Sequence, residues 1–186
     1  MSEEPFELPA GRLTDGEVTL RLPRLEDANA LAQGVRDPAI VRYAAVSWAG
    51  DSEEELAERI ATAWPEAAQA GNRLDLAIAT ANDDAVIGYL VVFGVIRRHA
   101  RCEIGFVLFP EARGRGAMTR AIDLACRWAY AQGFVRVQAA TDVTNEAAQR
   151  TLARAGFKRE GVLRSYIAAP DGTRCDFEMY SRLASD

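Results

Sequence analysis

The chain has 186 residues, of which 49% are hydrophobic and 26% are charged. A chain of this length is expected to form one domain, and its composition is that of a globular protein rather than of a disordered chain, a collagen or a coiled coil. The 27 acidic and 22 basic residues leave a net charge of −5, which disfavours nucleic-acid binding by the molecule as a whole.

Cysteine and histidine usage argues against a metal centre. Cys102, Cys126 and Cys175 are far apart in the chain, and His99 is the only histidine. A zinc site needs three or four such ligands at close spacing, and a Ser-His-Asp triad would depend on His99 alone. The longest apolar run, 85–96, is too short to cross a bilayer. We therefore expect a cytoplasmic protein with reduced thiols, no metal and no membrane contact.

The N-terminal third predicts one strand and two helices. Alternating apolar residues over 17–24 indicate the strand. A short amphipathic helix then begins at Leu25 and is expected to end before Pro38, because the residue preceding a proline disfavours helical geometry. A second helix over 51–71 begins with three glutamates that suit the helix dipole, and Pro65 must kink or restart it.

The remaining chain combines strands and helices. Strands over 74–81 and 85–96 are joined by a turn-rich connection, and the second is apolar on both faces, which is typical of a central strand. The other predicted elements are a strand at 101–109, helices at 116–132 and 145–155, a strand at 134–143, and two strands from 157 onward around Pro170-Asp171-Gly172. This order predicts a single α/β domain built on a mixed sheet.

A glycine-containing segment between a strand and a helix carries the strongest chemical signal. Residues 113–119 read Arg-Gly-Arg-Gly-Ala-Met-Thr, and such glycines let main-chain N–H groups converge at a helix N-terminus as an anion site. The surrounding segment 97–120 holds six arginines and two glutamates, which favours a polyphosphate ligand. Neither the P-loop nor the dinucleotide fingerprint fits, because no lysine follows the glycines and Thr119 replaces the last glycine. An ordinary glycine turn is the alternative.

These residues resemble a known family. Arg113-x-x-Gly116 before an amphipathic helix is similar to the acetyl-CoA pyrophosphate loop of GNAT-superfamily N-acetyltransferases, whose pattern is Q/R-x-x-G-x-G/A and from which Met118 departs. The strand 103–108 and the helix from Asn145 to Gly156-Phe157 also match the family pattern. In the tail, 160–164, 171–172 and 176–181 are similar to the RimJ/RimL-like branch, which acetylates ribosomal-protein N-termini. The first 70 residues match only in their strand-helix-helix order.

The resemblance implies a particular fold. It is an α/β (α+β) fold with a mixed, mostly antiparallel central sheet of about seven strands, flanked by about four helices. Within a single domain over 1–186, residues 10–72 would form the acceptor side. Residues 73–186 would form the acetyl-CoA-binding core and the C-terminal strands.

The resemblance also implies how acetyl-CoA is bound. Gly105 suggests a bulge where its strand splays from the next one and admits the pantetheine arm. Main-chain groups of Phe106, Val107 and Leu108 would contact that arm, and an N–H near Val107 would stabilise the oxyanion. The pyrophosphate would be held by Arg113, Gly114, Arg115, Gly116, Ala117, Met118 and Thr119. Asn145 would contact coenzyme A, and a helix cap is an equally good interpretation of that residue.

A general base is expected because the attacking amine must lose a proton. An α-amine with a pKa near 7.8 is about 15% neutral at pH 7, whereas a lysine side chain near 10.4 is only about 0.04% neutral. Glu103, on the strand beside the thioester, is the candidate base, acting directly or through water. A surface ion pair of Glu103 with Arg101 or Arg136 is the alternative.

The general acid is less well defined. Family members often protonate the departing thiolate with a tyrosine or a serine, but those positions hold Leu152 and Ala148 here. Tyr166 is the candidate substitute, with a packed aromatic of the tail strand as the alternative.

The sequence thus predicts direct acetyl transfer from acetyl-CoA to a primary amine in a ternary complex. A protein N-terminal α-amine is the favoured acceptor, followed by a small amine or an antibiotic. Two alternatives stay open: a non-catalytic acyl-CoA-binding module, which the missing tyrosine and serine favour, and a nucleotide-binding domain. The oligomeric state is also open, with a homodimer among the options.

Overall fold

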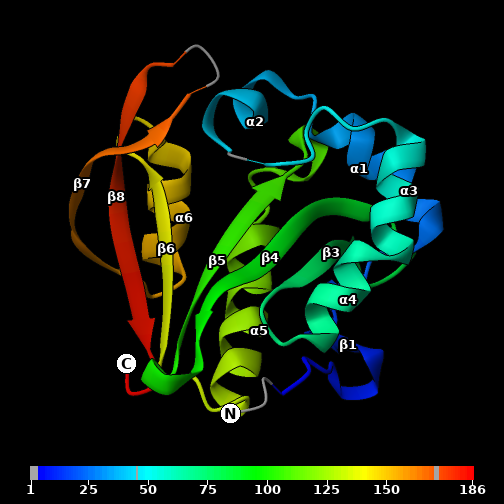
Figure 1. Cartoon of the computed structure of the whole chain (residues 1–186), viewed down its shortest axis with the longest axis horizontal. Coiled ribbons are helices and arrows are strands. Elements are labelled where there is room, and N and C mark those ends of the chain that lie inside the picture. Colours follow the sequence, from blue (N-terminus) through cyan, green and yellow to red (C-terminus); the bar gives the residue numbers. More distant parts are fainter. Residues whose placement is uncertain (1–3, 45, 170–171) are drawn as a thin grey trace.

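Eight strands form one sheet in the order β1-β2-β3-β4-β5-β6-β8-β7 (Figure 1). The structure is a computed structural model that describes residues 4–44, 46–169 and 172–186. The strands are β1 (Arg12–Thr14), β2 (Val18–Arg21), β3 (Leu74–Thr80), β4 (Val86–Ile96), β5 (Arg101–Leu108), β6 (Arg136–Asp142), β7 (Lys158–Ala168) and β8 (Arg174–Leu183). Every neighbouring pair is antiparallel except β5 and β6, which are parallel. β4 lies between β3 and β5, as its apolar sequence predicts.

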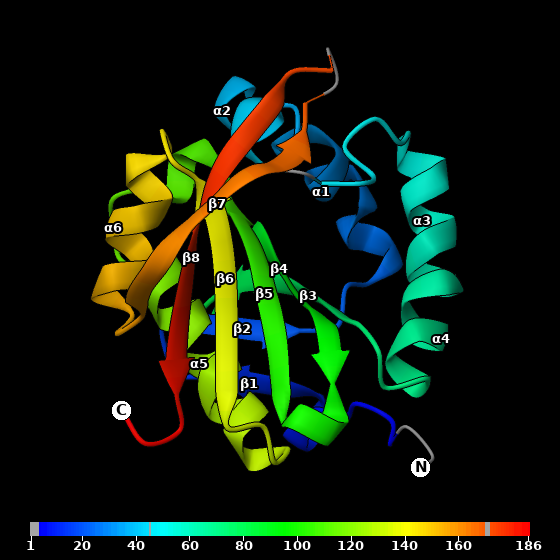
Figure 2. The ribbon, with the colours of Figure 1, turned by 60° about the vertical axis from the view of Figure 1, so that its left-hand side comes forward.

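Helices cover both faces of this sheet (Figure 2). The described residues form six α-helices: α1 (Ala28–Gly34), α2 (Pro38–Tyr43), α3 (Glu53–Ala61), α4 (Ala63–Gln69), α5 (Ala117–Ala131) and α6 (Glu146–Arg154). One face packs against α5 and α6, and the other packs against α1, α3 and α4. Because side chains alternate along a strand, Leu90 and Val92 of β4 join the first core, whereas Tyr89 and Val91 join the second.

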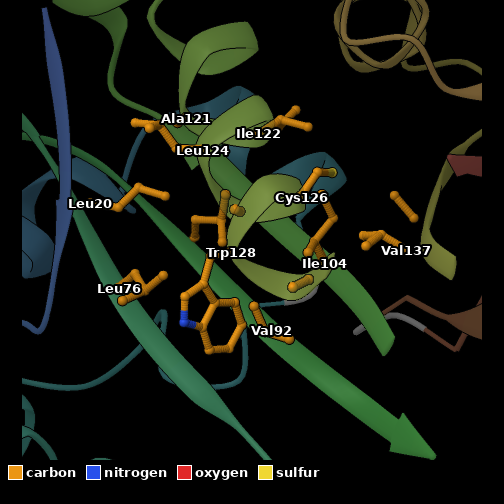
Figure 3. Close-up of a cluster of buried hydrophobic side chains, with 14 of the residues drawn as sticks. Leu20, Leu76, Val92, Ile104, Ala121, Ile122, Leu124, Cys126, Trp128 and Val137 are labelled. Carbon is orange, nitrogen blue, oxygen red and sulfur yellow. The ribbon is translucent and has the colours of Figure 1, made fainter. Parts of the chain in front are cut away.

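The first core is built around α5 (Figure 3). The inward side chains that the helical period predicts are all buried, namely Met118, Ile122, Ala125, Cys126 and Ala129. They belong to one cluster with strand residues such as Leu76, Ile104 and Val137. This packing gives the N-terminus of α5 a defined place at the end of β5.

The second core holds the N-terminal helices on the sheet. The rings of Trp48, Trp64 and Tyr89 pack with centroids 5.0 to 5.8 Å apart. The Tyr89 hydroxyl donates to Asp75, and Asp75 Oδ1 also accepts from Arg73 Nη2 at 2.8 Å. These contacts join α4 and the segment before α3 to β3 and β4.

Two short elements are not predicted by the sequence. The first helix ends before Pro38 as expected, at Gly34, but Pro38 then begins α2, and Asp37 Oδ1 accepts from the Ile40 N–H at 3.1 Å. Aspartate at the N-cap and proline at the first helical position both favour the start of a helix. The sequence prediction used Pro38 only as the residue that ends the preceding helix, and it therefore missed α2. The three residues of β1 are too few to show a period. The described residues therefore hold eight strands and six α-helices, against about seven and about four expected.

Three other expectations concern local features. The interruption near Pro65 is confirmed, because α4 restarts at Ala63 after a non-helical Thr62. The turn expected at 170–172 falls largely on residues 170 and 171, which lie outside the described residues. Over 4–44, 46–169 and 172–186, no helix is both long and apolar enough to span a bilayer.

Gly34 is expected to tolerate no larger side chain, because a Cβ at this position would overlap the ring of Phe109. Gly34→Ala should lower the melting temperature by roughly 2–10 °C, even though alanine is the better helix former. Thermal unfolding followed by circular dichroism measures this. Gly50→Ala is the control, since nothing lies within 4 Å of that position. Equal melting temperatures for the two variants would contradict the close packing, and Phe109→Leu should partly rescue Gly34→Ala.

Candidate active site

The sheet opens between β5 and β6. Their parallel pairing comprises only three residue pairs, Arg101 with Arg136, Cys102 with Val137 and Glu103 with Gln138. The two strands lie together at their starts and diverge toward their ends (Figure 1). Beyond Glu103, β5 continues to pair with β4 as far as Leu108 but, within the described residues, pairs with no strand on its β6 side. Main-chain groups of β5 are therefore available to an extended ligand in the gap.

The register shows which groups of β5 face the gap. The Phe109 N–H donates to Ile87 O of β4 at 2.9 Å. Because opposed residues of an antiparallel pair alternate between bonded and non-bonded, Val107 also directs its main-chain groups to β4. Phe106 and Leu108 direct theirs to the gap, so they are better placed than Val107 to contact a ligand there. One acceptor is already used, since Leu108 O accepts from Arg113 Nε at 3.0 Å.

The expected bulge at Gly105 is wrong. Gly105 pairs in regular register with Val91, and the irregularity of the β4–β5 pair lies instead between Phe93 and Ile96. Gly94, within that stretch, has a φ of +57° and lies against Glu103, so that a Cβ there would be 3.5 Å from the Glu103 Cβ. Glycine marks a bulge only where the chain needs a left-handed conformation, and the sequence does not tell Gly94 from Gly105.

The loop before α5 presents a row of free main-chain donors. Within the described part of the chain, the N–H groups of Gly114, Arg115, Gly116, Ala117, Met118 and Thr119 donate to no acceptor. Gly114 and Gly116 both have a φ of +80°, which residues with a Cβ rarely adopt. Gly116 is the N-cap of α5 and brings no capping side chain. These donors, together with the helix dipole, are suited to bind an anion.

The arginines of this loop have different partners. Arg113 Nη2 donates to Asp37 Oδ1 at 2.6 Å, so its guanidinium joins the loop to the start of α2. Arg120 Nη1 pairs with Asp15 Oδ2 at 2.9 Å. Arg115 is exposed and has no ion-pair partner among the described residues, and it lines a pocket of about 390 Å³ with Glu111 and others. Arg115 is therefore the arginine of this loop that is most available to a ligand.

Met118 departs from the Gly/Ala of the family pattern without obstructing the loop. Its side chain is 6% exposed and belongs to the core beneath α5. Only its main-chain N–H is presented to the anion site, so the side-chain substitution leaves that donor in place.

Asn145 caps α6. Its Oδ1 accepts from the Ala148 N–H at 3.2 Å, which agrees with the helix-cap interpretation. Its amide nitrogen has no partner among the described residues, so this group is free to donate to a ligand at the same end of the gap.

Glu103 is half-buried at the closed end of the gap. Its Oε2 accepts from Gln138 Nε2 at 3.0 Å. The alternative of a surface ion pair is not observed: Arg136 pairs with Glu160, and within the described residues Glu103 has no cation within 4 Å. Burial raises the pKa of Glu103, and the hydrogen bond from Gln138 and the charge of Arg101 oppose that rise. A carboxylate with a raised pKa is suited to accept a proton.

Tyr166 lies on β7 and is 43% exposed. Its ring centroid is 5.8 Å from that of Phe177, so part of the ring is packed. Burial and, to a lesser degree, the charge of Glu103 raise the pKa of Tyr166. Leu152 is fully buried and Ala148 carries no acidic proton, so neither supplies a general acid.

Several partners of these residues are not predicted by the sequence. They are Gln138 for Glu103, Asp37 for Arg113 and Glu160 for Arg136. Each partner lies at least 24 residues away in the chain. Such pairs depend on strand register and loop packing, so no local pattern reports them. Among the described residues, no group of three or more metal-ligating side chains comes together.

Comparison with known proteins identifies the class. A family model described as an acetyltransferase (GNAT) domain matches residues 17–158. The chain therefore belongs to the family of GNAT acetyltransferase domains. It is 34% identical over 97 residues to YoaA, described as an uncharacterized N-acetyltransferase of Bacillus subtilis (strain 168). That match covers 52% of this chain and 54% of YoaA, so it spans about half the length of this relative.

Solved structures are similar over the whole fold. RimJ of Mycobacterium smegmatis, in complex with CoA-disulfide, has a TM-score of 0.81 and 23% identity, covering 94% of this chain and 85% of that chain. RimL, a ribosomal L7/L12 α-N-protein acetyltransferase in complex with coenzyme A, has a TM-score of 0.81 and 20% identity, covering 92% and 97%. The expected GNAT fold is thereby confirmed.

We expect Glu103 and Glu160 to titrate on opposite sides of the ordinary glutamate pKa of 4.5. Burial raises the pKa of Glu103, whereas hydrogen bonds from Arg136 and Ser181 lower the pKa of Glu160 to about 2. Carbon-13 NMR of the side-chain carboxyl groups measures both midpoints, with Glu103→Gln and Glu160→Gln to assign the signals. A midpoint for Glu103 at or below 4.5 would contradict the burial seen at this site.

Proposed function

We propose that this protein transfers an acetyl group from acetyl-CoA directly to a primary amine in a ternary complex. The observation that carries the proposal is the combination of two features at one end of the sheet. The gap between β5 and β6 exposes main-chain groups of β5, and the loop beyond it offers six consecutive N–H donors that have no acceptor among the described residues. An extended pantetheine arm ending in a pyrophosphate matches this arrangement in shape and in hydrogen-bonding capacity.

The donor substrate would be held mostly by the main chain. Phe106 and Leu108 suit hydrogen bonds to the pantetheine amides, because their main-chain groups are directed into the gap. The N–H groups from Gly114 to Thr119, with the α5 dipole, suit the pyrophosphate. Arg115 and the free amide nitrogen of Asn145 add polar contacts, while Arg113 braces the loop against Asp37.

Glu103 would act as the general base. Acetyl-CoA supplies the thioester carbonyl that the amine attacks. As the new carbon–nitrogen bond forms, Glu103 takes a proton from the amine, directly or through water, and the carbon–sulfur bond breaks. A main-chain N–H of β5, from Phe106 or Leu108, suits the negative charge on the carbonyl oxygen. Tyr166 is the candidate that returns a proton to the departing thiolate, whose own pKa near 8.5 also lets it leave unprotonated.

A protein N-terminal α-amine is the acceptor we favour, with a small amine or antibiotic next. The support is twofold: the similarity to RimJ and RimL, and the low pKa of α-amines, which eases deprotonation. We assign residues 10–72 to the acceptor side of a single domain and residues 73–186 to the acetyl-CoA side. The cytoplasmic location and the homodimer stay predictions.

A non-catalytic acyl-CoA-binding module is the second candidate. It is favoured by Leu152 and Ala148, which stand where family members often carry an acid. The two functions differ in the release of free thiol from acetyl-CoA in the presence of amines. Thiol release with an N-terminal peptide or another amine supports the transferase. Saturable acetyl-CoA binding without release on any amine of the panel supports the module instead.

Gly116→Ala should weaken acetyl-CoA binding. Alanine strains the left-handed conformation by about 1–2 kcal/mol and turns the N–H donors away, so we expect the dissociation constant to rise by roughly 5- to 30-fold. Isothermal titration calorimetry measures it. Gly133→Ala is the matched control, because Gly133 has a φ of +84° at the other end of α5 and, like Gly116, has open space around it. Equal dissociation constants for acetyl-CoA in the two variants would show that the loop before α5 does not bind the pyrophosphate.

Glu103→Gln should lower turnover by roughly 100-fold or more near neutral pH while acetyl-CoA binding is retained. In the wild type, kcat/KM should fall as the pH drops through the raised pKa of Glu103, because the protonated acid cannot accept a proton. The Glu103→Gln variant should lack this fall in kcat/KM at low pH. Glu66→Gln, an exposed glutamate of α4, is the control. An unchanged rate for Glu103→Gln would exclude the carboxylate as the base.

A further inference from the structure

A chain of hydrogen bonds crosses four strands and ends on Glu103. Ser181 Oγ on β8 donates to Glu160 Oε1 on β7 at 2.6 Å. Glu160 accepts from both terminal nitrogens of Arg136 on β6, each at 2.6 Å. Arg136 Nε donates to Gln138 Oε1 at 3.3 Å, and Gln138 Nε2 donates to Glu103 Oε2 on β5 at 3.0 Å. The chain ends at the last pair of the β5–β6 ladder, where the gap begins.

The direction of the Gln138 amide follows from chemistry. A guanidinium carries only donors, so the atom of Gln138 that faces Arg136 must be the carbonyl oxygen. The amide nitrogen must then face Glu103. Since this nitrogen can only donate, its bond is stronger to a charged carboxylate oxygen than to the carbonyl oxygen of the protonated acid, and it therefore favours the charged form of Glu103.

Arg136 is itself held in place. Its guanidinium makes a bidentate pair with Glu160, a geometry that fixes the plane of the group, and Ser181 holds Glu160 from the next strand. Gln138 is 9% exposed, so water has little access to compete for its amide. The amide is therefore confined between a fixed donor and Glu103.

We propose that Gln138 is a positioning residue that aims Glu103 and holds it as the carboxylate, and that the Arg136–Glu160 pair fixes the direction of its amide. This inference rests on the proposed role of Glu103 as the base in acetyl transfer. Gln138 occupies Oε2 only, and within the described residues Oε1 of Glu103 has no partner. The free oxygen is the one that receives the proton of the amine.

Other groups also act on Glu103. Arg101 on the same strand favours its charged form, and Phe93 of β4 lies opposite it in the ladder and contributes no charge. Tyr166 of β7 and the buried thiol of Cys102 both feel the charge of Glu103, which contributes to their raised pKa values. None of these groups makes a hydrogen bond to the carboxylate, so Gln138 is the one direct donor among the described residues.

Gln138→Met tests the proposal, because methionine keeps the length of the side chain and removes the donor. We expect the NMR titration midpoint of Glu103 to rise by about 1 pH unit or more, the scale of a lost hydrogen bond to a charged group. The acid limb of kcat/KM should move by the same amount, and activity should recover at higher pH. A midpoint equal to or below the wild-type value would overturn the proposal.

Two further variants keep the test decisive. Arg136→Met frees the amide to turn, so that its oxygen can accept from protonated Glu103, and the midpoint should rise here too. Should Gln138→Met fail to fold, an unchanged midpoint in Arg136→Met overturns the proposal. Gln69→Met, an exposed position on α4, is the control and should leave the titration midpoint of Glu103 unchanged. The NMR midpoint is measured without any substrate. A wild type that acetylates no amine would therefore refute the proposed function, while the midpoints still decide the role of Gln138.

Discussion

The early end of the β5–β6 pairing is the constraint on which the site depends. Three residue pairs join these strands, and beyond Glu103 no strand among the described residues pairs with β5 on that side. Unpaired main-chain groups carry a free-energy cost unless water or a ligand satisfies them. Among the described strands, β5 and β6 are the one parallel pair of neighbours; the opening lies between them, and α5 connects them. The crossover that makes parallel pairing possible thus also delivers a helix N-terminus to the mouth of the gap.

The N-terminal third of the chain supports this site from a distance. Asp37 caps α2 and accepts from Arg113, and Gly34 allows the Phe109 ring to pack against α1. Both contacts reach the segment that joins β5 to the anion loop. The N-terminal helices and the loop before α5 are therefore connected by direct contacts, and a change in one is expected to move the other.

The surroundings of Glu103 and Glu160 shift the pKa values of these two glutamates in opposite directions. Glu160 is held by a guanidinium and a hydroxyl, which lower its pKa to about 2, so it stays charged and fixes Arg136. Glu103 has no ion pair among the described residues, and burial raises its pKa. Gln138 lies between Arg136, the partner of Glu160, and Glu103, and it carries no charge itself. It therefore limits the rise in the pKa of Glu103 without abolishing the basicity of that carboxylate.

The sequence alone determined the elements with clear periodicity and the loop whose glycines imply main-chain donors. The face of α5 from Met118 to Ala129, the central place of β4 and the break near Pro65 follow from local rules. Only the tertiary structure decided the features that depend on strand register and loop packing. The irregularity of the β4–β5 pair lies at Gly94 rather than at Gly105. Arg113 pairs with Asp37, and Gln138 rather than an arginine faces Glu103. The physical reason is that periodicity reports which face of an element is buried, whereas the partner across a strand pair is set by the packing of segments far apart in the chain.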